Sequence, residues 1–206
     1  MLSRLREFSN TFFEKFSFLG KFFSPNEITI FGIILAILGS IFLIQKNFFL
    51  SAFFFLLSGF FDLLDGIIAR KFKKVTGFGG VLDAVVDRYE EFLFAFSSFL
   101  SGFVEGWLAL VAFLSMVMPS YTRARAESTG KMKTCNVGVL ERQEKLLLFI
   151  TALILQNFFK EALFFCFIII AILGQITVLQ RLFAVKKEES KRRIKNKKTE
   201  NKKRKI

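Results

Sequence analysis

Long apolar runs separated by short polar links are the main pattern along this chain. Each run approaches the roughly 20 residues that an α-helix needs to cross about 30 Å of hydrocarbon. Backbone amides in lipid must bond within their own segment, so runs of this length predict helices and not open sheets. The expected fold is an all-α integral membrane protein. Its six predicted transmembrane helices cover residues 27–45, 48–70, 79–102, 107–124, 141–157 and 161–182.

The N-terminal stretch shows a different pattern. Apolar side chains recur at steps of three and four residues between positions 2 and 22, with charged and polar side chains between them. This spacing predicts an amphipathic helix over residues 1–24 that lies in the membrane interface, although a helix packed on the bundle has the same pattern. Charged residues such as Arg4 and Glu7 interrupt the apolar positions, so we do not expect a cleaved signal peptide.

Residues 25–185 then form a single transmembrane domain, followed by a basic tail at residues 186–206. The net charge of +13 is mostly that of residues 181–206, which hold 13 Lys and Arg against 3 Glu. A segment of this composition predicts disorder beyond about residue 186. Its place directly after a helix end favours contact with anionic membrane lipids, and we expect no nucleic-acid partner.

The distribution of charge predicts the orientation. Lys and Arg are concentrated before residue 24 and in the links at residues 70–74 and 123–145, whereas the opposite links hold only Lys46 and Lys160. Positively charged loops stay on the cytoplasmic side of a membrane. We therefore predict a multi-pass protein of the plasma membrane with both termini and the polar ends of the helices in the cytoplasm.

Two pairs of aspartates are the most informative polar residues. Asp62 and Asp65 are three residues apart, and Asp83 and Asp87 are four apart, so each pair shares one face of a helix. A carboxylate near hydrocarbon is unfavourable and usually serves a function. If the two faces oppose each other, the four carboxylates surround one point and suit hard divalent cations such as Mg²⁺ or Mn²⁺.

Other interpretations of these aspartates are less favoured. An acidic network that only holds helices together is disfavoured because buried charge pairs stabilise weakly and no excess of basic partners shares these helix faces. A cation transporter predicts acids near the membrane midplane and broken helices, whereas these acids gather at the cytoplasmic helix ends. The chain contains no His, which excludes a Ser-His-Asp triad and a His-ligated zinc site.

The aspartates also match a family signature. The stretch from Asp62 to Asp87 reads D-x-x-D-G-x-x-A-R, eight residues, then G-x-x-x-D-x-x-x-D, and it resembles the CDP-alcohol phosphatidyltransferases at every fixed position. The resemblance implies transfer of a lipid phosphoryl group from a CDP-lipid to a polar alcohol, with release of CMP. It also implies that Asp62, Asp65 and Asp83 hold two metal ions, that Asp87 is the catalytic base and also a metal ligand, and that the enzyme is a homodimer.

The same resemblance implies a nucleotide site. Residues 24–29 resemble the P-N-x-x-T opening that precedes the first span in these enzymes, and a simple helix start gives a similar pattern. Glycines beside the aspartates leave room for a nucleotide to approach the backbone. For Arg70, interfacial snorkelling is the alternative to a contact with the diphosphate. The implied nucleotide and CDP-lipid residues are Asn26, Thr29, Asp62, Gly66, Ala69, Arg70 and Gly79.

The acceptor is predicted from residues 119–127 and 141–145. These segments resemble the inositol-phosphate branch of the family, the archaetidylinositol phosphate and phosphatidylinositol phosphate synthases, although Ser128 stands where Gly is common. Arg123, Arg125 and Arg142 are the predicted clamp for an acceptor phosphate, because the guanidinium fork suits phosphate; positive-inside topology alone is the alternative. The expected acceptor is 1L-myo-inositol 1-phosphate, and CDP-archaeol is favoured over CDP-diacylglycerol as donor. Serine, glycerol 3-phosphate or free inositol as acceptor, or CDP-inositol as donor, are the alternatives within the family.

Overall fold

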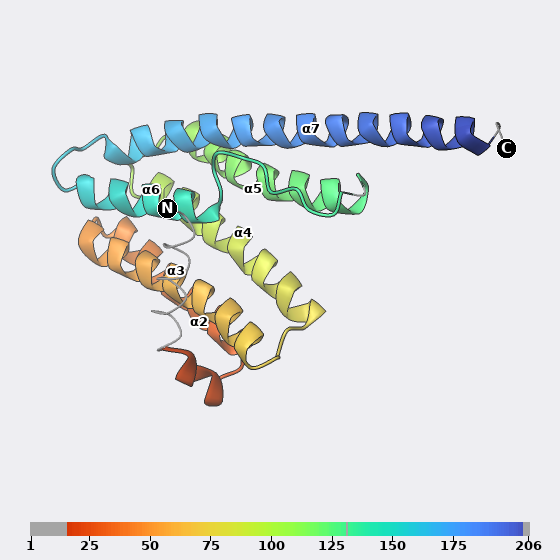
Figure 1. The fold of residues 1–206 in the computed structure, drawn as a ribbon. Helices are drawn as coiled ribbons and strands as arrows, with labels where there is room; N and C mark the ends of the chain where they lie inside the picture. Colours follow the sequence, from red (N-terminus) through yellow and green to blue (C-terminus); the bar gives the residue numbers. More distant parts are fainter. Residues whose placement is uncertain (1–15, 131, 204–206) are drawn as a thin grey trace.

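The structure is a computed structural model that describes residues 16–130 and 132–203. This part of the chain contains six α-helices, a short 3₁₀ helix and no strand (Figure 1). The prediction of an all-α fold is therefore confirmed for the described residues. The elements are η1 (Ser17–Lys21), α2 (Pro25–Ile44), α3 (Phe48–Lys71), α4 (Gly77–Leu100), α5 (Gly106–Ser128), α6 (Arg142–Leu155) and α7 (Ala162–Lys203).

Local sequence signals explain where the helices begin. Ser24 and Glu27 form a reciprocal capping box at the start of α2, and Pro25 occupies the first turn, where its missing N–H is not needed. Thr76 caps α4 by accepting a hydrogen bond from the backbone N–H of Gly79 at 3.0 Å. These caps satisfy backbone donors that a helix leaves unpaired at its N-terminus.

The helices form two packed groups that meet in one core. Helix α2 lies against both α3 and α4, α5 lies along α7, and α6 contacts α3 on one side and α7 on the other (Figure 1). Small residues permit the closest approaches, as is common between helices in membranes. A Cβ atom added to Gly174 of α7 would lie 2.2 Å from the carbonyl oxygen of Ser115 in α5.

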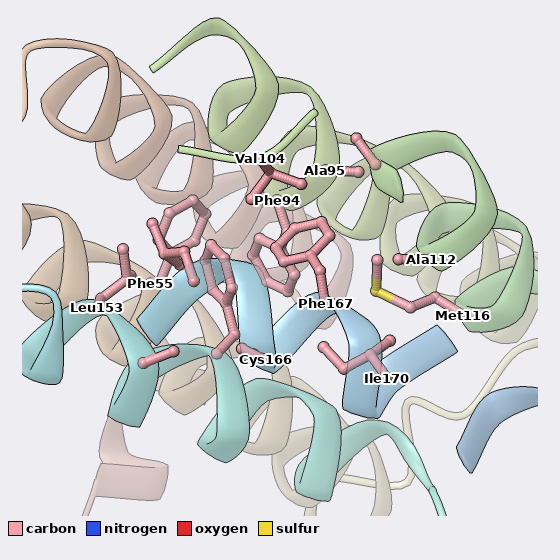
Figure 2. Close-up of a cluster of buried hydrophobic side chains, with 14 of the residues drawn as sticks. Phe55, Phe94, Ala95, Val104, Ala112, Met116, Leu153, Cys166, Phe167 and Ile170 are labelled. Carbon is pink, nitrogen blue, oxygen red and sulfur yellow. The ribbon is translucent and has the colours of Figure 1, made fainter. Parts of the chain in front are cut away.

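Phenylalanine rings fill the centre of the bundle. Figure 2 shows Phe55 of α3, Phe94 of α4 and Phe167 of α7 grouped with aliphatic side chains from neighbouring helices. The ring centroids of Phe55 and Phe94 are 4.6 Å apart with perpendicular planes, and Phe94 stacks on Phe149 of α6 at 4.8 Å. Such aromatic pairs stabilise a core beyond the area that they bury. The cluster joins α3, α4, α6 and α7 into one body.

The helix bounds follow the first five predicted spans within a few residues, and α7 begins at the start of the sixth and runs past its predicted end. Within the described residues, three helices are long and apolar enough to cross a membrane: Pro25–Ile44, Phe48–Lys71 and, within α7, Ala162–Arg193. Helix α4 is 24 residues long but carries five charged side chains, and α6 has only 14 residues. The prediction that all six helices cross the membrane therefore stays a prediction.

Helix α7 differs from the predicted ending of the chain. Disorder was expected from residue 186, whereas the structure continues α7 through residues 186–203 without a break. Lys, Arg and Glu favour helix, and the preceding span has already formed the turns that start it. Glu188 pairs with Arg192 at 3.5 Å and Glu189 with Arg193 at 2.6 Å. The partners of each pair are one helical turn apart, so both pairs stabilise the helix. Most of the predicted interfacial helix at residues 1–24 lies outside the described residues.

Candidate metal centre and active site

Three of the four predicted aspartates converge between α3 and α4. Asp62, Asp83 and Asp87 each present a carboxylate oxygen, and these oxygens all lie within 4.8 Å of one another. We call these three residues the carboxylate trio. Helix α2 packs against both α3 and α4, and it thereby fixes the separation across which the trio meets. The spacing of the aspartates along each helix turns the three side chains toward this gap.

Asp65 occupies a different position from the trio. It is buried, and its carboxylate accepts a hydrogen bond from the hydroxyl of Thr29 in α2. Asp65 does not belong to the group of oxygens within 4.8 Å. It lines a cavity beside the trio instead, so its predicted role as a metal ligand stays a prediction.

The predicted nucleotide residues other than Asp62 share one cavity of about 300 Å³. The cavity lies between the N-terminus of α2, the C-terminal half of α3 and the N-terminus of α4. Asp83 also lines it, so the cavity borders the trio directly. Its lining includes Asn26, Thr29, Gly66, Ala69, Arg70 and Gly79.

Gly79 lines this cavity at a point where there is little room for a side chain. A Cβ atom at this position would lie 3.0 Å from the hydroxyl oxygen of Thr76 and 3.1 Å from the side-chain oxygen of Asn26. Such distances are closer than ordinary van der Waals contact, so a larger residue would force the side chains of Thr76 and Asn26 to shift by a few tenths of an ångström. The glycine thus leaves Asn26 free to present its amide to a ligand.

Arg142 forms ion pairs with two members of the trio, Asp62 and Asp87. It is the first residue of α6, held there by a capping box between Glu141 and Glu144. Its Nη1 atom pairs with Asp62 and lies 2.6 Å from the Oδ1 atom of Asp87, and its Nη2 atom lies 2.7 Å from the Oε2 atom of Glu90. The guanidinium therefore neutralises part of the charge that the carboxylates concentrate here.

Two of the three predicted acceptor arginines, Arg123 and Arg142, form ion pairs with different carboxylates. Arg123 and Arg125 are exposed on the last turns of α5. Arg123 pairs with Glu127 at 3.1 Å. Glu127 also accepts a hydrogen bond from the backbone N–H of Cys135 at 3.0 Å, and these two donors lower the pKa of its carboxyl group. The structure thus joins Arg123 to the link that follows α5, while Arg142 lies on the carboxylates.

A buried ionic network beside the trio was not predicted from the sequence. Glu91 is 2% exposed and pairs with Lys145 of α6, which is 4% exposed, and also with Arg88 at 3.1 Å. Lys145 further donates to the backbone oxygen of Met116 at 3.1 Å. The basic partners of these carboxylates are thus Arg142 and Lys145 of α6 together with Arg88 of α4 itself. Charged residues at positions 88, 90 and 91 of an apolar run were the signal that could have indicated this network.

The donor set fits a hard divalent cation. The trio offers only carboxylate oxygens, the ligands that Mg²⁺ and Mn²⁺ prefer, and it carries more negative charge than Arg142 alone neutralises. The cavity with Asn26 and Arg70 on its walls lies next to these oxygens. A diphosphate bound there can reach both a cation on the trio and the polar groups of the cavity.

Comparison with known proteins assigns the family. A model of the CDP-alcohol phosphatidyltransferase family matches residues 22–177, which include the trio and every residue of the cavity. The chain belongs to the CDP-alcohol phosphatidyltransferase family. This confirms the resemblance found at Asp62–Asp87, and it makes the protein a transferase of phospholipid synthesis.

Similar members of the family include proteins named as synthases of inositol phosphate lipids. The archaetidylinositol phosphate synthase of Pyrococcus horikoshii is 33% identical over 164 residues, which cover 80% of this chain and 84% of that protein. The phosphatidylinositol phosphate synthase of Mycobacterium tuberculosis has been solved with CDP-DAG bound, with a TM-score of 0.70, 27% identity, and coverage of 79% of this chain and 86% of that one. Its complex with manganese and citrate gives a TM-score of 0.71 at 27% identity, covering 81% and 84%.

Proposed function

We propose that this phosphatidyltransferase transfers the lipid phosphoryl group of a CDP-activated lipid to 1L-myo-inositol 1-phosphate and releases CMP. The proposal is carried by the cavity between α2, α3 and α4. There the predicted nucleotide residues line a space that borders the carboxylate trio. The similar enzymes from Pyrococcus horikoshii and Mycobacterium tuberculosis are both named as inositol phosphate lipid synthases, which supports this acceptor.

In the proposed reaction the acceptor hydroxyl attacks the lipid-side phosphorus of the CDP-lipid. A new phosphorus–oxygen bond forms there, the bond to the CMP phosphate breaks, and CMP leaves with the bonding electron pair. Asp87 takes the proton of the attacking hydroxyl as general base. Asn26, Thr29 and Arg70 hold the nucleotide and its diphosphate in the cavity.

The proposed metal ligands are Asp62, Asp65, Asp83 and Asp87, with two Mg²⁺ or Mn²⁺ ions per site. When bound, such ions neutralise the diphosphate and the leaving group. Manganese in the complex of the similar mycobacterial enzyme supports a divalent ion. Thr29 orients Asp65 through its hydrogen bond, so that this carboxylate reaches a ligand from the cavity side.

We further propose that Arg123, Arg125 and Arg142 bind the phosphate of the acceptor. Arg142 is the member of this set that lies at the trio, where the attacking hydroxyl must lie. Exposed Arg123, which is tied to Glu127, lies at the end of α5, and it is suited to guide an anionic substrate toward the site. For the donor we favour CDP-archaeol over CDP-diacylglycerol, in line with the archaeal synthase among the relatives.

A panel of acceptors tests this function. Purified protein receives CDP-archaeol or CDP-diacylglycerol, Mg²⁺ or Mn²⁺, and one acceptor at a time, and CMP release is measured. We expect the highest kcat/KM with inositol 1-phosphate, by at least about tenfold, because discrimination requires paired charges for its phosphate. Faster turnover with serine, glycerol 3-phosphate or free inositol would replace the acceptor, and turnover of CDP-inositol would replace the donor. Failure to release CMP with any of these acceptors in the presence of Mg²⁺ or Mn²⁺ would contradict the proposed reaction.

We also propose that the protein spans the plasma membrane with both termini and the trio on the cytoplasmic side, and that it forms a homodimer like the family that it resembles. The orientation rests on the excess of Lys and Arg near the N-terminus and in the links at residues 70–74 and 123–145, because the opposite links hold only Lys46 and Lys160. Chemical cross-linking in membranes tests the dimer. A monomer at all cross-linker concentrations would contradict it.

Thiol labelling of intact cells tests the orientation. We expect Lys46→Cys or Lys160→Cys to react with a membrane-impermeant maleimide, and Lys73→Cys to react only after the cells are opened. Cys135 and Cys166 are buried, so the unmodified chain is the control and should label weakly in both conditions. Labelling of Lys73→Cys in intact cells, with protection of Lys46→Cys, would reverse the proposed topology.

A further inference from the structure

Arg142 makes two kinds of contact that differ in what a cation would do to them. Through Nη1 it pairs with Asp62 and Asp87, which are members of the carboxylate trio. Through Nη2 it pairs with Glu90 at 2.7 Å, and Glu90 is not a member of the trio. One guanidinium thus bridges the trio and a carboxylate outside it.

The trio contacts of Arg142 compete with a divalent cation. The Oδ1 atoms of Asp62 and Asp87 that face Nη1 are carboxylate oxygens of the same groups that offer ligand atoms to a metal. A guanidinium and a metal ion are both positive and repel each other at this distance. Binding of the ion therefore requires Nη1 to give up these oxygens.

The Glu90 contact has no such conflict. Glu90 lies on α4, three residues after Asp87, and is 4% exposed. The hydroxyl of Ser58 in α3 donates a hydrogen bond to its Oε1 atom at 2.7 Å, while Arg142 occupies its Oε2 atom. Both oxygens of Glu90 are thus fixed. A buried carboxylate without a positively charged side chain beside it is strongly unfavourable. The ion pair between Arg142 and Glu90 therefore holds both side chains in place.

We propose that Glu90 is a positioning residue that anchors Arg142 beside the trio, so that Arg142 and a divalent cation are alternative partners of Asp62 and Asp87. When the cation binds, Nη1 is released while Nη2 stays on Glu90. The guanidinium is then turned toward the site with free donors for an acceptor phosphate. The inference deepens the proposed function and rests on it in one respect, the binding of a divalent cation by the trio.

Binding of Mn²⁺ to the purified full-length protein tests the proposal without any turnover. Free Mn²⁺ is measured by electron paramagnetic resonance in titrations of the wild type, Arg142→Ala, Glu90→Gln and the double variant. We expect Arg142→Ala to bind Mn²⁺ about tenfold more tightly, because its competitor is removed. Glu90→Gln should weaken binding, because the displaced guanidinium loses its anchor.

The double variant separates anchoring from a simple loss of charge. Glu90→Gln removes one negative charge in both backgrounds, so the part of its effect that depends on Arg142 is the difference between them. We expect that difference to be about fivefold or more. Arg142→Lys is a second test should Arg142→Ala not fold. It keeps the charge without the fork that spans Glu90 and the trio, and it should also bind Mn²⁺ more tightly than the wild type.

The outcomes distinguish this inference from the function on which it rests. A wild-type protein without saturable Mn²⁺ binding would remove the metal centre of the proposed function, and the inference with it. If the wild type binds Mn²⁺ and both Arg142→Ala and Arg142→Lys bind it with the same affinity, Arg142 does not compete with the cation, although the metal centre itself stands. If Glu90→Gln changes the Mn²⁺ affinity by the same factor in the wild type and in Arg142→Ala, Glu90 does not act by anchoring Arg142. Recovery of wild-type Mn²⁺ affinity by Glu90→Asp supports the assigned role of the carboxylate.

Discussion

Asp83→Asn is expected to reduce CMP release from a CDP-lipid by about 10³-fold, because loss of a metal ligand removes several kcal/mol of transition-state stabilisation. Asp83 is the best member of the trio for this test. It joins Asp62 and Asp87 at the proposed metal centre and also lines the cavity, and no ion pair with Arg142 is recorded for it. The substitution therefore leaves the Arg142 contacts intact, so a lost rate reports on the centre itself.

The matched control is Glu189→Gln. It removes a carboxylate that pairs with Arg193 on the exposed part of α7, so turnover should stay within about twofold of the wild type, since exposed pairs contribute little. EDTA should abolish the activity of the wild type, and added Mg²⁺ or Mn²⁺ should restore it. Turnover by Asp83→Asn within tenfold of the wild type, or full activity in EDTA, would contradict the proposed centre.

Glu91→Gln is expected to lower the stability of the protein by about 3–5 kcal/mol, because it leaves the buried ammonium of Lys145 without a carboxylate. Lys145 is 4% exposed, and it would keep its hydrogen bond to the carbonyl oxygen of Met116. For a chain of this size, such a loss corresponds to a fall of about 6–20 °C in Tm. Thermal unfolding of the purified protein in detergent measures it.

Two further variants give this prediction its controls. Glu188→Gln removes an exposed carboxylate paired with Arg192 and should change Tm by no more than about 4 °C. The double variant Glu91→Leu with Lys145→Met removes the pair between α4 and α6 and leaves Arg88 its contact with Asp87 at 3.5 Å. It should recover at least half of the loss, since an apolar pair of similar volume often replaces a buried ion pair without penalty. A Glu91→Gln protein as stable as the wild type would show that the pair contributes nothing to folding.

The sequence was most informative where spacing along a single helix decides the geometry. Asp83 and Asp87 share a face because they are one turn apart, and the cavity beside them gathers the residues that the signature and the P-N-x-x-T opening indicate. Helix bounds were also predictable, because the apolar runs of α2 and α4 begin shortly after the N-cap residues Ser24 and Thr76.

The contacts of α6 could not be predicted in this way. Arg142 and Lys145 reach carboxylates on α4 through long side chains, across a separation of more than fifty residues in sequence. Periodicity identifies the face of a helix but not its neighbour, so the basic partners of Glu90 and Glu91 were missed. The same limit applies to Arg123, which the sequence groups with Arg142 and the structure joins to Glu127.

The unbroken course of α7 restricts what its charges can touch. A helix rises 1.5 Å per residue, so the 18 residues from 186 to 203 extend about 27 Å along the axis of the span that precedes them. Figure 1 shows the C-terminal end of α7 extending beyond the end of α5, and Arg192 still donates a hydrogen bond to the backbone oxygen of Gly130 at 3.3 Å. The attraction of anionic headgroups decays over about 8 Å at physiological ionic strength. If α7 crosses the bilayer upright, only its first basic turns sense the lipid surface, and its end is a positively charged arm that reaches solutes well away from the membrane.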